Sequence, residues 1–96
     1  EFKVAKVEEI PIGGVKLVEA NAKSIAIFNV NGRFHACNAV CPHMGGPLNE
    51  GAVEGGHVVC PFHGLRANLE TGESDMGMPV EIFKVKVVGS DIFLEI

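Results

Sequence analysis

Short runs of alternating apolar and polar residues dominate both ends of the chain. Phe83, Val85 and Val87 alternate with two lysines, and after Gly89-Ser90-Asp91 the alternation resumes and continues to Ile96. Alternation with a period of two residues is typical of a strand with one buried face. No window of about a dozen residues shows the 3.6-residue periodicity of an amphipathic helix. The pattern therefore predicts an all-β fold built from antiparallel hairpins.

Two dipeptides indicate hairpin turns inside this pattern. Asn31-Gly32 separates an apolar, β-branched run over residues 24–30 from a second run over 33–37. Gly55-Gly56 lies in the same way between the segments 48–53 and 57–60. A type I′ turn requires positive φ at both central residues, which Asn and Gly adopt readily. We expect a hairpin at each dipeptide.

The middle of the chain, from about residue 38 to residue 77, has no clean alternation. Most of the twelve glycines and three of the five prolines lie in this segment. Functional residues are commonly carried on loops that a rigid scaffold positions. We therefore expect a loop-built site mounted on a β scaffold.

Composition narrows the class of protein. The chain of 96 residues is long enough for one domain, and its net charge of −4 argues against nucleic acid as a general partner. No apolar run approaches the roughly 18 residues of a membrane span. Because the first residues do not show a basic segment followed by an apolar one, we expect neither a membrane span nor an unprocessed precursor. Three cysteines are too few for a secreted disulfide scaffold, so we expect a cytoplasmic protein. Because it starts at Glu1, we expect a chain trimmed or cut from a longer one.

Four of the seven Cys and His residues form two tight pairs. One pair is Cys41 and His43, the other is Cys60 and His63, and sixteen residues separate the pairs. Each pair can direct a sulfur and a nitrogen ligand from a single loop. Two such loops side by side would supply two sulfur and two nitrogen ligands, with turn glycines and prolines placing backbone N–H groups toward the metal site.

This pattern resembles the Rieske iron–sulfur signature, and the stretches CPHMGGPLNEG and CPFHG resemble the soluble Rieske ferredoxins. The resemblance implies one 2Fe-2S cluster, with Cys41 and Cys60 on one iron and His43 and His63 on the other. It also implies an antiparallel β-sandwich with a loop-built cluster-binding subdomain inserted. We expect a single domain whose basal part spans about residues 1–38 and 67–96, and whose cluster-binding part spans about residues 39–66.

The same resemblance implies a low reduction potential within the Rieske class. The high-potential branch has a disulfide between its cluster loops, and those positions correspond here to Gly46 and Phe62. Its two hydroxyl donors correspond to Leu65 and Ala67, which cannot donate. Because hydrogen bonds to sulfur stabilise the reduced cluster, we expect a potential in the lower part of the range of about −150 to +300 mV.

The function implied by the resemblance is that of a one-electron carrier, not of an enzyme. Its donor would be a flavoprotein reductase, and its acceptor a terminal oxygenase of the ring-hydroxylating dioxygenase kind or a similar redox enzyme. We expect a cytoplasmic monomer. Two alternatives remain open: a small Rieske subunit or domain of a larger enzyme such as nitrite reductase, and a zinc-stabilised binding module, since zinc accepts the same ligand types.

The remaining chemically notable residues have structural interpretations. We expect Cys37 to be a small buried hydrophobic residue, and His35 and His57 to have structural roles in strands. Gly77-Met78-Pro79 is expected to form a third loop over the cluster. The loops are expected to have little other core. The residues expected to form an apolar collar are Met44, Pro61, Phe62, Leu65 and Met78, and those expected to form a solvated acidic face are Glu50, Glu54, Glu70, Glu73 and Asp75.

Overall fold

The computed structural model describes residues 2–42, 45–62 and 64–95, and in them the chain is almost entirely strands and loops. The described residues form nine strands and two short 3-10 helices. The strands are β1 (Phe2–Lys6), β2 (Val15–Ala20), β3 (Lys23–Val30), β4 (Arg33–Asn38), β5 (Ala52–Glu54), β6 (His57–Val59), β7 (Arg66–Asn68), β8 (Ile82–Val88) and β9 (Asp91–Glu95). The 3-10 helices are η1 (Val7–Glu9) and η2 (Leu48–Glu50).

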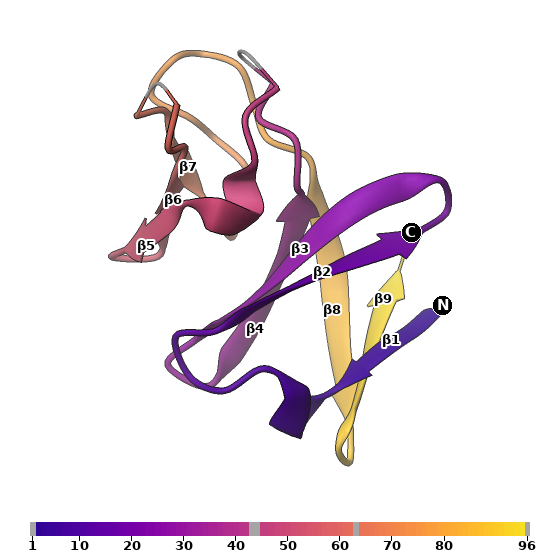
Figure 1. Ribbon diagram of the computed structural model, residues 1–96. Coiled ribbons are helices and arrows are strands. Elements are labelled where there is room, and N and C mark those ends of the chain that lie inside the picture. Colours follow the sequence, from indigo (N-terminus) through magenta and orange to yellow (C-terminus); the bar gives the residue numbers. More distant parts are fainter. Residues whose placement is uncertain (1, 43–44, 63, 96) are drawn as a thin grey trace.

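The strands form two antiparallel sheets. The larger has six strands in the order β1-β9-β8-β4-β3-β2, and the smaller has three in the order β5-β6-β7. Figure 1 shows the small sheet at one end of the molecule, displaced from the pair formed by β1 and β9. The all-β, antiparallel fold predicted from the alternation is confirmed.

Both predicted glycine-containing turns are present. Asn31 and Gly32 have φ values of 54° and 93° and join β3 to β4. Gly55 and Gly56 have φ values of 56° and 79° and join β5 to β6. Positive φ at both central residues brings the twist of the turn into line with that of the strands, so the local sequence alone is sufficient to place these hairpins.

The turn between β2 and β3 was not predicted. Asn21 and Ala22 form it with φ values of 53° and 61°. A left-handed conformation is unfavourable for alanine because its β-carbon approaches the backbone. The pairing of β2 with β3, from Val15 opposite Phe28 to Ala20 opposite Lys23, imposes this conformation on Ala22.

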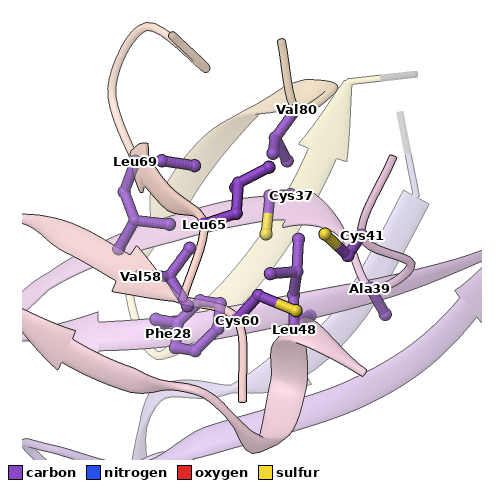
Figure 2. Close-up of a cluster of buried hydrophobic side chains, with 12 residues drawn as sticks. Phe28, Cys37, Ala39, Cys41, Leu48, Val58, Cys60, Leu65, Leu69 and Val80 are labelled. Carbon is purple, nitrogen blue, oxygen red and sulfur yellow. The ribbon is translucent and has the colours of Figure 1, made fainter. Parts of the chain in front are cut away.

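Buried apolar side chains form two clusters. The first contains β-sheet residues such as Ile25, Ile27, Ile92 and Leu94. The second lies where the larger sheet meets the small sheet and the loops (Figure 2). We call it the junction cluster; it consists of Ala26, Phe28, Cys37, Ala39, Cys41, Leu48, Val58, Cys60, Leu65, Ala67, Leu69 and Val80.

The junction cluster corrects one expectation from the sequence. The loops were expected to have little core of their own, yet Leu48, Val58 and Leu65 are fully buried there. The prediction was wrong because these residues are scattered among glycines and prolines and show no periodicity. Only the folding of the small sheet onto β3 and β4 gathers them.

Asn29 is a buried polar side chain in this fold. Its Nδ2 atom donates to the carbonyl oxygen of Ile10 at 2.7 Å, and its Oδ1 atom accepts from the N–H of Gly32 at 2.8 Å. Both hydrogen-bonding ends of the amide are therefore satisfied, which makes its burial tolerable. The side chain ties the segment after η1 to the β3–β4 turn.

Candidate metal centre

The loop after β4 carries Cys41 in a closed turn. The N–H of Cys41 donates to the carbonyl oxygen of Gly46 at 2.8 Å, and the N–H of Gly45 donates to the carbonyl oxygen of Cys41 at 2.9 Å. Gly45 has a φ of 73°, a conformation that favours glycine. The turn thus places the Cys41 side chain at the start of a tight five-residue reversal.

The loop after β6 repeats this arrangement around Cys60. The N–H of Cys60 donates to the carbonyl oxygen of Leu65 at 2.8 Å, and the N–H of Gly64 donates to the carbonyl oxygen of Cys60 at 2.9 Å. Gly64 has a φ of 72°. Two loops with different sequences therefore hold a cysteine in the same hydrogen-bonded frame, with the glycine four residues later in both cases.

The two loops lie against each other. A β-carbon built on Gly46 would lie only 2.9 Å from the Sγ atom of Cys60 and 3.1 Å from the ring of Phe62. Cys41 and Cys60 are each 1% exposed and belong to the junction cluster. In Figure 2 they lie on the same side of that cluster, whereas Val58 and Leu69 lie on the other.

The contact between Gly46 and Phe62 bears on the missing disulfide. These are the positions at which the high-potential branch was expected to have its loop-bridging cysteines. The structure brings the two positions together, so the loops meet here without a covalent bond. The contact combines a residue with no side chain and an aromatic ring.

The predicted histidine ligands, His43 and His63, lie outside the described residues. Within residues 2–42, 45–62 and 64–95, no three Cys, His, Asp or Glu side chains are grouped as a metal site. The assignment of all four ligands therefore stays a prediction.

The donor set that is described fits a sulfur-ligated metal group. Cys41 and Cys60 supply two buried thiols from matching turns, and the glycine between the loops keeps the space beside Cys60 clear of a β-carbon. All three cysteines are free thiols, so neither of these two is consumed by a disulfide.

Cys37 differs from the other two cysteines. It lies in β4, is fully buried, and burial raises its pKa to about 12. A thiol with that pKa stays protonated and uncharged at neutral pH. The prediction that Cys37 is a small buried hydrophobic residue is confirmed.

The predicted apolar collar is only partly present at the surface. Phe62 is 62% exposed, whereas Leu65 is fully buried in the junction cluster. Leu65 lies inside the molecule because its loop returns to close the hydrogen bond with Cys60. Pro61 is exposed and Met78 half-buried, while Met44 lies outside the described residues.

The segment expected to form a third loop over the cluster leads into β8. The hydroxyl of Ser74 donates to the carbonyl oxygen of Met78 at 2.6 Å. The N–H of Val80 donates to the carbonyl oxygen of Gly72 at 2.8 Å. Val80 is buried in the same cluster as Cys41 and Cys60. Whether Gly77-Met78-Pro79 covers a metal group stays a prediction.

The other titratable residues behave as expected. His35 is half-buried in β4, and burial, with a smaller effect of the Arg33 charge, lowers its pKa. His57 Nδ1 lies 3.1 Å from the carbonyl oxygen of Gly55. All five acidic residues predicted to form a solvated face are exposed: Glu50, Glu54, Glu70, Glu73 and Asp75.

A set of polar residues at the base of the Cys41 loop was not predicted from the sequence. The side-chain oxygen of Asn38 accepts from the N–H of Val40, and its amide nitrogen donates to Glu81. An Asn three residues before a predicted ligand is a weak signal of a capped turn. Its partner, 43 residues away in sequence, has no local signal at all.

Within the described residues, no helix is long and apolar enough to cross a membrane.

Comparison with known proteins identifies a family and two kinds of relative. The family model of the Rieske 2Fe-2S domain matches residues 1–84. The chain is 32% identical over 97 residues to the biphenyl dioxygenase ferredoxin subunit of Pseudomonas sp., a match covering 97% of this chain and 89% of that protein. It is 37% identical over 73 residues to apoptosis-inducing factor 3 of Homo sapiens, covering 76% of this chain but only 12% of that protein.

Solved structures show the same fold. A chain in the complex of reduced oxygenase and oxidised ferredoxin in carbazole 1,9a-dioxygenase superposes with a TM-score of 0.89 at 28% identity, covering 98% of this chain and 100% of that one. The ferredoxin of carbazole 1,9a-dioxygenase from Nocardioides aromaticivorans superposes with a TM-score of 0.91 at 20% identity, covering 97% and 94%.

Proposed function

Because the chain belongs to the Rieske 2Fe-2S domain family, we propose that it is a one-electron carrier. Its cluster would be bound by the thiolates of Cys41 and Cys60 and by the imidazoles of His43 and His63. When bound, such a cluster supplies a one-electron redox couple. The chain itself is not an enzyme but a component of a multicomponent redox system.

The observation that carries this proposal is the matching pair of cysteine turns. Cys41 and Cys60 each begin a turn closed by the same two backbone hydrogen bonds, and both thiols are buried where the two turns meet. The two cysteine side chains are buried in the junction cluster together with Leu48, Leu65 and Val80. A pair of buried thiols on matching turns is suited to binding a metal–sulfur group.

We propose a low potential for the cluster. Leu65 and Ala67 are both fully buried beside the Cys60 turn, and neither has a hydroxyl to donate. The negative charge gained on reduction would be stabilised by fewer hydrogen bonds than in the high-potential branch.

The proposed acceptor is a terminal oxygenase, and the proposed donor is a reductase. The acceptor is supported by the carbazole 1,9a-dioxygenase complex, whose ferredoxin and oxygenase are bound together. We propose that this chain acts as a monomer in a reducing compartment such as the cytoplasm, which agrees with three free cysteines.

A second candidate function follows from the match to apoptosis-inducing factor 3. The chain spans 12% of the length of that protein, so the matching part there is one portion of a much longer chain. A Rieske domain attached to a larger redox protein would have its partner within the same molecule. Size-exclusion chromatography of the isolated chain distinguishes the diffusing carrier from the attached domain. A diffusing carrier has no partner interface left exposed, so it is expected to elute as a stable monomer.

The test of the main proposal is electron paramagnetic resonance of the dithionite-reduced protein, with iron and sulfide assays. A rhombic signal with an average g-value below that of the free electron, integrating to about one spin per chain, is expected of this mixed-ligand two-iron cluster. Cys60→Ala is expected to abolish both the signal and the bound iron. Colourless protein that contains zinc would refute the proposal.

A further inference from the structure

Three side chains form a connected polar network at the base of the Cys41 loop. Lys23 Nζ lies 2.7 Å from Oε2 of Glu81, and Oε1 of Glu81 accepts from Nδ2 of Asn38 at 3.3 Å. Oδ1 of Asn38 then accepts from the backbone N–H of Val40 at 2.9 Å. The network therefore runs from a charged pair to the backbone N–H of Val40, the residue immediately before Cys41.

The network joins three strands at one point. Lys23 begins β3, Asn38 ends β4, and Glu81 directly precedes β8. Backbone hydrogen bonds join the same residues, since the N–H of Asn38 donates to the carbonyl oxygen of Glu81 at 2.9 Å. The N–H of Ala39, the next residue, donates to the carbonyl oxygen of Ser24, also at 2.9 Å. The Cys41 loop leaves the larger sheet here, and the segment containing Met78 and Pro79 returns to it.

Each member has a reason to keep its orientation. The ammonium group of Lys23 also lies 5.4 Å from the centre of the Phe83 ring, within the range of a cation–π contact. Hydrogen bonds from Lys23 and Asn38 lower the pKa of Glu81, so its carboxyl is ionised at neutral pH. An ionised carboxylate can only accept hydrogen bonds, which forces the Asn38 amide to turn its nitrogen to Glu81 and its oxygen to Val40.

We propose that Lys23, Glu81 and Asn38 are positioning residues that hold the backbone before Cys41 in the conformation required by the metal centre. The expected effect on metal retention rests on the proposed function. The positioning of the backbone at Val40 is a property of the polypeptide and does not depend on it. Residues that orient metal ligands from outside the ligand set commonly change metal retention when they are removed.

Global stability is a poor explanation for this network. Exposed ion pairs contribute little to the free energy of unfolding, and the Glu81 side chain is 45% exposed. The effect of its removal should therefore be local, at the Val40 amide and the adjoining cysteine.

The chain offers a matched control in the Lys16–Glu9 pair. Lys16 Nζ lies 2.8 Å from Oε2 of Glu9, and the Glu9 side chain is also 45% exposed. Glu9 Oε1 additionally accepts from the backbone N–H of Lys6 at 2.7 Å, so each carboxylate bridges a lysine and a second donor. Glu9 follows β1 and precedes β2, and it has no link to the cysteine turns.

The first experiment measures amide hydrogen exchange in the cluster-free protein. Glu81→Ala is expected to accelerate exchange at Val40 by about fivefold, the worth of one typical hydrogen bond, and Glu9→Ala is expected to leave it unchanged. Glu81→Gln is expected to retain most of the protection, because the Gln amide oxygen can still accept from Asn38.

The second experiment measures the rate at which an iron chelator removes the cluster. The visible absorbance of the cluster reports this loss. Glu81→Ala and Asn38→Ala are each expected to accelerate the loss by about tenfold, with Glu9→Ala at the wild-type rate. The rate of cluster loss in Glu81→Gln is expected to be close to the wild-type rate. A general loss of packing would not produce this difference between the Gln and Ala variants.

The outcomes separate this inference from the proposed function. Equal acceleration in Glu81→Ala and Glu9→Ala, or no acceleration at Val40 in either, would overturn the positioning role. Wild-type protein that binds no iron and sulfide would instead overturn the proposed function. The Val40 exchange rates would still decide whether the network holds this segment.

Discussion

A β-carbon placed on Gly46 would lie 2.9 Å from the Sγ atom of Cys60. The same β-carbon would lie 3.1 Å from a ring carbon of Phe62. Gly46 closes the first cysteine turn, and Cys60 and Phe62 belong to the second. The absence of a side chain at one residue thus allows the two turns to meet.

Gly46→Ala is therefore expected to impair the metal centre more than the fold. The added methyl group must displace either the Cys60 sulfur or the Phe62 ring, and a displaced sulfur is a poorer ligand. We expect the iron and sulfide content of the purified variant to fall to less than half of the wild-type content.

Gly89→Ala is the control for this substitution. Gly89 has a φ of 62°, and a β-carbon there would meet no atom within 4 Å. The control introduces backbone strain of about 1 kcal/mol without approaching a cysteine. Full iron content in Gly46→Ala would show that the contact is unimportant for metal binding.

Leu65→Ser is expected to raise the reduction potential of the loaded protein. Leu65 closes the Cys60 turn through its carbonyl oxygen, so a hydroxyl at this residue would lie beside the cysteine and favour the more negative, reduced state. The loss of a fully buried leucine should also lower the free energy of unfolding by about 3 kcal/mol.

Leu69→Ser separates the two effects in the same redox titration. Leu69 is 1% exposed and lies in the same cluster, but it does not close a cysteine turn. It should lose similar stability with an unchanged potential. An equal change of potential in both variants would contradict the proposed role of a hydroxyl at residue 65.

Cys37→Ala is expected to keep the full iron and sulfide content, in contrast to Cys60→Ala. It should also alter the pH dependence of stability. The folded-state pKa of Cys37 is raised to about 12 from an ordinary value of 9.0, so its contribution to stability is complete below pH 9.0. That contribution is lost as the pH rises toward 12, because the unfolded chain releases the proton first.

Denaturant unfolding of cluster-free protein between pH 8 and pH 11 checks this sign. The wild-type protein should lose more stability across that interval than Cys37→Ala does. Parallel curves for the two proteins would show that the thiol titrates alike in the folded and unfolded chains.

Ala22→Gly is expected to stabilise the protein. Ala22 has a φ of 61°, which glycine adopts at lower cost. The relief of about 1 to 2 kcal/mol is partly offset by the greater freedom of glycine in the unfolded chain, leaving a gain of about 0.5 to 1 kcal/mol. Thermal unfolding measures the change, and Ala52→Gly in β5 should have the opposite sign.

A feature could be predicted from the sequence when neighbouring residues alone cause it, and not when distant residues do. The Asn31-Gly32 turn was predicted because the positive φ values are a property of the two residues themselves. The Asn21-Ala22 turn was missed because strand pairing imposes its conformation against the preference of alanine. The full burial of Leu65 was not predicted, because a lone leucine between glycine and arginine has no periodicity to reveal it.

The sequence by itself determined the hairpins at Asn31-Gly32 and Gly55-Gly56, the two cysteine-containing pairs and the class of chemistry that their residue types permit. All of these follow from residue identities within a few positions of each other. Tertiary structure alone decided that Gly46 lies against Cys60, that the loops have a buried core, and that Asn38 meets Glu81. These contacts join residues far apart in the chain, and their energies depend on the packing of two sheets rather than on any local preference.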